Sequence, residues 1–126
     1  MSMEWSQIEI FKGIDLNDSF VLNWHHENDH LSFELEASIW PESEHYTASK
    51  NYEYTCYRKA TLEFVGVKNI SGLKSKESVQ STTDPDGSID YGNIDDLKEL
   101  GDSFLVVGDF GSVSIQGGEL RFEIHT

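Results

Sequence analysis

Leu31-Ser32-Phe33-Glu34-Leu35-Glu36-Ala37-Ser38-Ile39 alternates apolar and polar side chains without exception. Successive side chains of a β-strand point to opposite faces, so this pattern predicts a strand with one face in a core and the other in water. A second apolar segment, residues 20–24, precedes it, and the polar residues 25–30 between the two predict a hairpin loop. The fold is therefore expected to be built from antiparallel strands.

Further strands are expected towards the C-terminus. Residues 54–67 are rich in Tyr, Thr, Phe and Val and predict a long strand. Arg58 within it requires either a bulge or an arginine that points inward toward a carboxylate. Residues 104–110 are apolar on both faces, which is typical of a central strand. Two alternating segments flank Gly117-Gly118, so a final hairpin with a tight turn is predicted there.

One helix and one more strand complete the prediction. The helix is expected over residues 93–100, because Asn93 can cap it while Asp95 and Asp96 favour the positive N-terminal end. Residues 3–12 are expected to add the strand. The predicted fold class is therefore mainly β, either an antiparallel sandwich or a strongly bent sheet of six to seven strands with one short helix.

Length and composition favour one domain over residues 1–126. A chain of 126 residues with 12% aromatic side chains can build a core without a metal or disulfide. Cys56 is the only cysteine, which fits a reducing compartment. The sequence shows neither a signal peptide nor an apolar run of the roughly 20 residues that span a bilayer, so a cytoplasmic protein without membrane contact is expected.

The net charge of −14 is unevenly distributed along the chain. Residues 1–49 carry ten acids and one base, and residues 77–126 carry eleven acids and two bases, whereas residues 50–76 carry six bases and two acids. Phosphate backbones repel such a surface, so nucleic-acid binding is not expected. A basic protein partner would be attracted, although acidity alone can also serve solubility.

The segment Asp84-Pro85-Asp86-Gly87-Ser88-Ile89-Asp90 resembles the middle of an EF-hand calcium loop, in which acids alternate and a glycine makes the sharp turn. The resemblance implies that Asp84, Asp86 and Asp90 supply oxygen ligands to calcium. It fails at both ends, where Thr82 and Asn93 stand in the positions of the first and last ligands. A plain turn is the preferred interpretation, so no cofactor is expected and calcium is the alternative.

No other set of residues predicts chemistry. His26 and His30 have a spacing that binds zinc on a helix, but the local pattern predicts a hairpin, and no second Cys or His cluster completes a site. Ser19 beside Asp18 and near His25 can be drawn as a triad, but no nucleophile motif surrounds it. Cys56 is expected to be a core residue, and the protein is not expected to be an enzyme.

The hydrophobic spacing of residues 16–125 resembles that of small β-rich bacterial proteins, some of which are immunity proteins that neutralise polymorphic toxins. The residues that carry the resemblance are Asp18-Ser19, Trp24, Leu31-x-Phe33-x-Leu35 and Ala60-x-Leu62-x-Phe64-x-x-Val67. The resemblance implies a non-enzymatic inhibitor whose acidic surface covers a basic toxin.

The sequence therefore predicts an acidic protein-binding domain, with an immunity-type inhibitor of a basic toxin as its most specific form. The predicted partner contacts belong to the acidic connection near residue 90, and they are Asp84, Asp86, Asp90, Tyr91, Asp95 and Asp96. The alternative is a calcium-binding or small-ligand-binding β domain that uses residues 84–90. A monomer and a homodimer are both compatible with the sequence.

Overall fold

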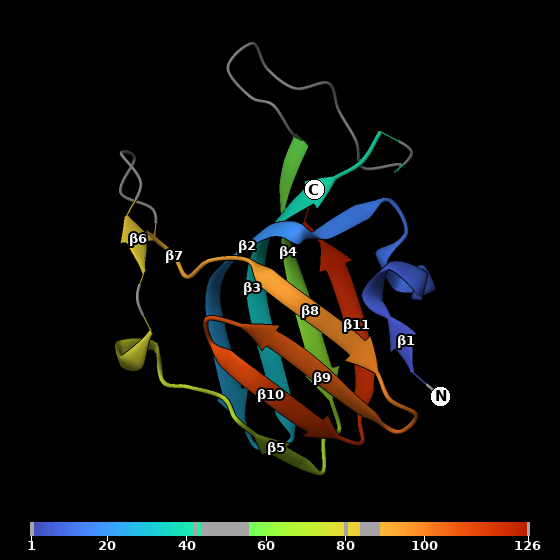
Figure 1. Ribbon diagram of the computed structural model, residues 1–126, viewed down its shortest axis with the longest axis vertical. Helices are drawn as coiled ribbons and strands as arrows, with labels where there is room; N and C mark the ends of the chain where they lie inside the picture. Colours follow the sequence, from blue (N-terminus) through green and yellow to red (C-terminus); the bar gives the residue numbers. More distant parts are fainter. Residues whose placement is uncertain (1, 42, 44–55, 80, 84–88, 126) are drawn as a thin grey trace.

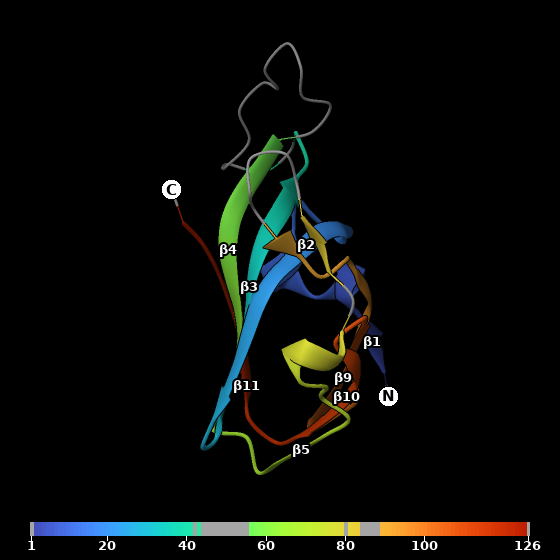
Figure 2. The ribbon, with the colours of Figure 1, turned by 90° about the vertical axis from the view of Figure 1, so that its left-hand side faces the viewer.

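The computed structural model of the protein describes residues 2–41, 43, 56–79, 81–83 and 89–125. These residues form two large antiparallel β-sheets that lie face to face, with a hydrophobic core between them. Figure 1 views the five-stranded sheet in front of the four-stranded one, and Figure 2 shows the two layers edge-on. The predicted mainly β sandwich is confirmed.

The four-stranded sheet has the predicted hairpin at one side. Its order is β11-β4-β3-β2, with the bounds Glu119–Ile124, Cys56–Val65, His30–Ile39 and Ile14–Glu27. The strands of the hairpin run further than predicted, so that only Asn28 and Asp29 remain for the turn. Asn28 has a φ of 55°, a left-handed conformation that asparagine tolerates in tight turns.

The irregularity expected at Arg58 is not a bulge. The ladder between β3 and β4 keeps one register over its whole length. Arg58 therefore shares the inward side of β4 with Cys56 and Ala60, and its half-buried guanidinium donates a hydrogen bond of 2.8 Å to the backbone carbonyl of Tyr57. Cys56 is 2% exposed, as predicted for a core residue.

The five-stranded sheet has the order β1-β8-β9-β10-β5, with the bounds Met3–Glu4, Ile94–Glu99, Ser103–Gly108, Gly111–Gln116 and Asn69–Ser71. The apolar segment β9 is central, as predicted. A separate small pair joins β6 (Thr82–Thr83) and β7 (Ile89–Asp90), after the 3-10 turn η3 (Lys76–Ser78). The predicted number of strands is too low, because strands of two or three residues leave no periodic pattern in a sequence.

The predicted helix over residues 93–100 is wrong, because this segment is strand β8 with a bulge between Ile94 and Asp96. A bulge adds one residue to a strand, so Ile94 and Leu97 both face the core although they are three positions apart. The prediction rested on Asn93 as a cap and on Asp95 and Asp96 after it, and such residues are also common in turns outside helices. Beyond the bulge, Asp96 and Lys98 share the outer side, as alternate residues of a strand do.

Two more local predictions are wrong. Residues 3–12 contain only the short β1 and two 3-10 turns, η1 (Trp5–Gln7) and η2 (Glu9–Phe11), each of which places an aromatic ring in the core. Gly117 and Gly118 do form a turn with positive φ, but it leads from β10 in one sheet to β11 in the other. The two strands therefore do not pair, and the turn connects the two sheets instead of the two strands of a hairpin.

Aromatic rings join the two sheets. Phe110, which follows β9 and is fully buried, has its ring centroid 4.8 Å from that of Phe33 on β3 and 6.0 Å from that of Trp24 on β2. Phe64 on β4 and Phe104 on β9 make a second contact between the sheets, with centroids 5.2 Å apart. Such edge and tilted ring contacts stabilise beyond their buried area.

The chain after β5 crosses the start of β10 at very short range. Gly72 and Gly111 have φ of 93° and 125°, and a Cβ at either position would overlap a backbone oxygen, that of Ser112 in the first case and that of Gly72 in the second. The amide of Lys74 then donates a hydrogen bond of 2.8 Å to the carbonyl of Phe110. Glycine is therefore required here by both conformation and space.

We expect Gly111→Ala to destabilise the protein far more than Gly101→Ala. Both positions have positive φ, which costs about 1–2 kcal/mol for alanine, but a Cβ at Gly101 meets no atom within 4 Å. The alanine at position 111 must in addition displace the Gly72 carbonyl, so its cost should be at least twice as large. Urea unfolding measures the free energy of unfolding of both variants, provided that the m-value is unchanged. Equal losses for the two variants would contradict the close crossing.

Candidate functional site

The outward side of the four-stranded sheet is strongly acidic. Since the apolar residues of these strands face the core, the residues that alternate with them face outward. The two basic side chains among the outward positions of the regular ladders are Lys59, which lies opposite Glu36, and Arg121, whose Nη2 is 3.1 Å from Glu119 Oε2. The glutamates of this surface, the acidic face, are Glu27, Glu34, Glu36, Glu63, Glu119 and Glu123.

The acidic face also contains an apolar part next to β2. The Phe20 ring lies 5.7 Å from that of Tyr57, whose hydroxyl donates a hydrogen bond of 3.2 Å to Asp18 Oδ2. A register shift between Val21 and Asn23 leaves Leu22 as an extra residue on β2. Leu22 borders a hollow of about 170 Å³, whose other side chains include Glu34, Lys59, Thr61 and His125. A polar rim around apolar side chains is the usual arrangement of a protein-binding surface.

The outer side of the five-stranded sheet is uncharged over β9 and β10. Its charges lie at the β1–β8 edge, where Lys98 Nζ is 3.4 Å from Asp96 Oδ2 and 3.7 Å from Glu4 Oε1. The hydrogen bond and the charge of Asp96, together with the charge of Glu4, raise the pKa of Lys98. The side chains that β9 and β10 turn outward are Ser103, Leu105, Val107, Ser112, Ser114 and Gln116. The two layers thus differ in the middle of their outer sides, where the four-stranded sheet carries glutamates and the strands β9 and β10 carry no charge.

The four predicted contact residues that the structure describes lie outside the four-stranded sheet. Asp90 Oδ1 accepts a hydrogen bond of 3.1 Å from the Gly92 amide, and the Tyr91 ring packs edge-on against Trp24 with centroids 4.9 Å apart. Asp95 is exposed at the bulge of β8 and Asp96 pairs with Lys98. The remaining two members of the set, Asp84 and Asp86, fall outside the described residues.

The sequence pattern indicated that several glutamates of the acidic face point outward, although the predicted contacts did not include them. The alternation from Leu31 to Ile39 already assigns Glu34 and Glu36 to the outward side of a strand, and the same alternation applies to Glu119 and Glu123. What the sequence could not show was the order β11-β4-β3-β2, which brings these glutamates onto one surface.

The histidine-rich hairpin shows no metal site in the described part of the chain, where no three metal-ligating side chains lie together. His25 and His26 are exposed near the end of β2. His30 Nε2 is 2.6 Å from Glu63 Oε2 on the acidic face. The hairpin, as predicted, does not give these histidines the geometry of a helix.

Ser19 has a structural role that excludes the triad arrangement. Its side chain is fully buried, and its hydroxyl donates a hydrogen bond of 2.8 Å to the Asp15 carbonyl and accepts one of 3.0 Å from the Ser38 amide. These bonds fix the irregular part of β2 against β3. His25 lies six positions along the strand, and its Nε2 is 3.2 Å from Nδ2 of the Asn23 side chain.

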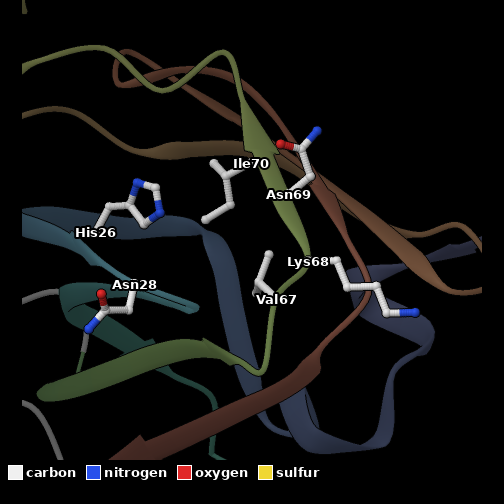
Figure 3. A pocket seen from close by; sticks show the side chains of 6 residues that line it. All are labelled: His26, Asn28, Val67, Lys68, Asn69 and Ile70. Atoms are coloured by element: carbon white, nitrogen blue, oxygen red, sulfur yellow. The ribbon is translucent and has the colours of Figure 1, made fainter.

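A second hollow, of about 230 Å³, lies at the hairpin tip between His26, Asn28 and the segment from Val67 to Ile70. Figure 3 shows that the Lys68 side chain extends away from His26. The charged end of Lys68 and the imidazole of His26 therefore do not point toward a common centre, whereas the polar groups of a small-molecule site do.

Comparison with known proteins gives no relative, since no family model, no curated protein and no solved structure matches the chain. Among the described residues, no helix is long and apolar enough to cross a membrane. The function must therefore be argued from the surface of the molecule.

We expect Ser19→Ala to lower the free energy of unfolding by about 1–3 kcal/mol, because the buried Ser38 amide loses its acceptor. Ser32→Ala, on the outward side of β3, is the control and should change stability by less than about 0.5 kcal/mol. Urea unfolding of both variants checks the difference. A silent Ser19→Ala substitution would show that the hydroxyl does not hold β2 against β3.

Proposed function

We propose that this chain is a non-enzymatic protein-binding domain whose acidic face binds a basic protein. An immunity-type inhibitor that covers a basic toxin is the most specific form of the proposal, and it rests on the resemblance found in the sequence. The observation that carries the general form is the set of glutamates on the outward side of one sheet, whereas β9 and β10 of the opposite sheet turn no charged side chain outward.

Charge and apolar area support the proposal together. A one-signed surface speeds association with an oppositely charged partner and suppresses wrong partners, while apolar and aromatic anchors supply most of the binding free energy. The acidic face has both, because Phe20, Leu22 and Tyr57 lie beside Glu34 and Glu36. A rigid sheet also presents these groups with little loss of conformational entropy on binding.

No observation on the described residues favours the calcium alternative. Of its three predicted ligands, only Asp90 is described, and its carboxylate accepts a hydrogen bond from the backbone two residues ahead, as in an ordinary Asx turn. This geometry needs no cation.

The test removes charge from the acidic face without altering its shape. We expect the immobilised protein to capture basic proteins from an extract of its source cells at low salt, and to release them at 0.5 M salt because exposed charges are screened. Glu27→Gln/Glu34→Gln/Glu36→Gln should reduce this capture about tenfold. Mass spectrometry identifies and quantifies the captured proteins.

The control removes the same amount of charge elsewhere. Glu77→Gln/Asp102→Asn/Asp109→Asn changes three exposed acids of the connections around the five-stranded sheet, and should leave capture within about twofold of the original, since these charges lie off the acidic face. Equal losses for the two triple variants would show that only net charge matters. Capture of neutral or acidic proteins alone would contradict the proposal.

A further inference from the structure

The two large sheets of the sandwich end in four edge strands, and three of them are protected against pairing with another chain. β1 and β5 are only two and three residues long. β2 has two register shifts, and its middle is bonded to the segment before β8: the Val21 amide donates to the Gly92 carbonyl, and the Tyr91 amide donates to the Val21 carbonyl, both at 2.8 Å. Short, bulged and covered edges are the usual protection against edge-to-edge association.

The fourth edge, β11, lacks these protections. Its six residues pair with β4 in one unbroken register, and they contain neither proline nor a bulge. In the described part of the chain, no backbone hydrogen bond joins the other side of β11 to any segment. β11 is therefore a strand of regular register whose outer edge bonds to no described segment.

The free backbone groups of β11 can be assigned to particular residues. The His125 amide donates a hydrogen bond of 2.8 Å to the Lys59 carbonyl, which continues the β4 ladder. Backbone groups alternate sides along an antiparallel strand, so the odd-numbered residues bond to β4. The N–H and C=O groups of Leu120, Phe122 and Ile124 thus point to the free edge.

An apolar surface accompanies this edge. The side chains of Leu120, Phe122 and Ile124 are only partly buried although they face the core side. Ile10, 37% exposed, lines a hollow of about 310 Å³ together with Ile8 and Leu120. A strand added to this edge would extend the sheet beyond these side chains and remove them from water.

We propose that β11 pairs antiparallel with β11 of a second copy of this chain, with Phe122 opposite Phe122 of that copy. Leu120 then lies opposite Ile124, and these residues exchange the backbone hydrogen bonds that are free in the single chain. Arg121 lies opposite Glu123 of the second copy, twice by symmetry, in the non-hydrogen-bonded positions where side chains are closest. The two four-stranded sheets join into one continuous sheet.

Charge complementarity selects this register. A two-fold axis at Arg121 would place Arg121 opposite itself and Glu119 opposite Glu123, so like charges would meet at every charged position. An axis at Leu120 would keep an Arg121–Glu119 pair but shorten the overlap of the strands. Opposite charges across strands stabilise a sheet and like charges destabilise it, so the axis at Phe122 combines overlap with attraction.

The dimer should strengthen with salt, in contrast to the binding of a basic protein. Each copy carries a net charge of −14, and the mutual repulsion of two such molecules is screened as ionic strength rises. Failure of this proposal is therefore distinguishable from failure of the proposed function, because the two associations respond to salt in opposite directions and use different substitutions.

Sedimentation equilibrium of the full chain at 0.15 M salt, where charges in contact are less screened than at 0.5 M, tests the proposal with a charge swap. Arg121→Glu and Glu123→Arg each place like charges opposite one another and should weaken dimerisation about tenfold, since both symmetry-related pairs change from attractive to repulsive. The double variant Arg121→Glu/Glu123→Arg has the net charge of the original chain and restores opposite charges across the axis. Its dimerisation should return to within about threefold of the original.

Three outcomes would overturn the proposal. A chain that stays monomeric at 0.5 M salt has no such interface, and a Glu123→Arg variant that dimerises more tightly than the original shows that net charge decides, not the register. Hydrogen exchange gives an independent reading: the amides of Leu120, Phe122 and Ile124 should become protected as protein concentration rises. Fast exchange of all three in the dimer would place the interface elsewhere.

Discussion

The contact of Phe110 with Phe33 holds the two sheets in their relative position. Phe110 lies just after β9, and its ring reaches across the core to β3 of the other sheet. Its carbonyl accepts a hydrogen bond from the amide of Lys74 in the chain that crosses β10. One residue thus links both sheets and the crossing segment. The acidic face depends on this contact indirectly, because β3 can expose its glutamates on one side only while its apolar side chains are covered on the other.

Strands with regular alternation could be predicted from the sequence, whereas the bulged strand β8 could not. Residues 31–39 have the side-chain period of the sheet, and their inward and outward sides are as expected. In β8 the bulge between Ile94 and Asp96 changes the spacing of the core residues from two to three, which imitates a helix. The residues themselves do not show whether an inserted residue is accommodated by a bulge or by a turn of helix, because the hydrogen-bonding partner decides.

Sheet order was the second property that the sequence could not supply. The turn at Gly117 and Gly118 was located correctly from the two glycines, but strands next to each other in sequence there enter different layers. The candidate surface depends on this order. Residues 50–76 carry a positive net charge along the chain, yet in the fold β4 lies between β3 and β11. Lys59 therefore lies opposite Glu36, and Glu34 and Glu123 lie opposite the nearby Thr61.

The buried thiol of Cys56 gives this fold an internal reporter. Because it is the only sulfhydryl group of the chain and is 2% exposed at the first residue of β4, a thiol reagent can reach it only when that end of the sheet opens. The alkylation rate, compared with that of a free thiol, then measures the free energy of this local opening without a label or an engineered residue.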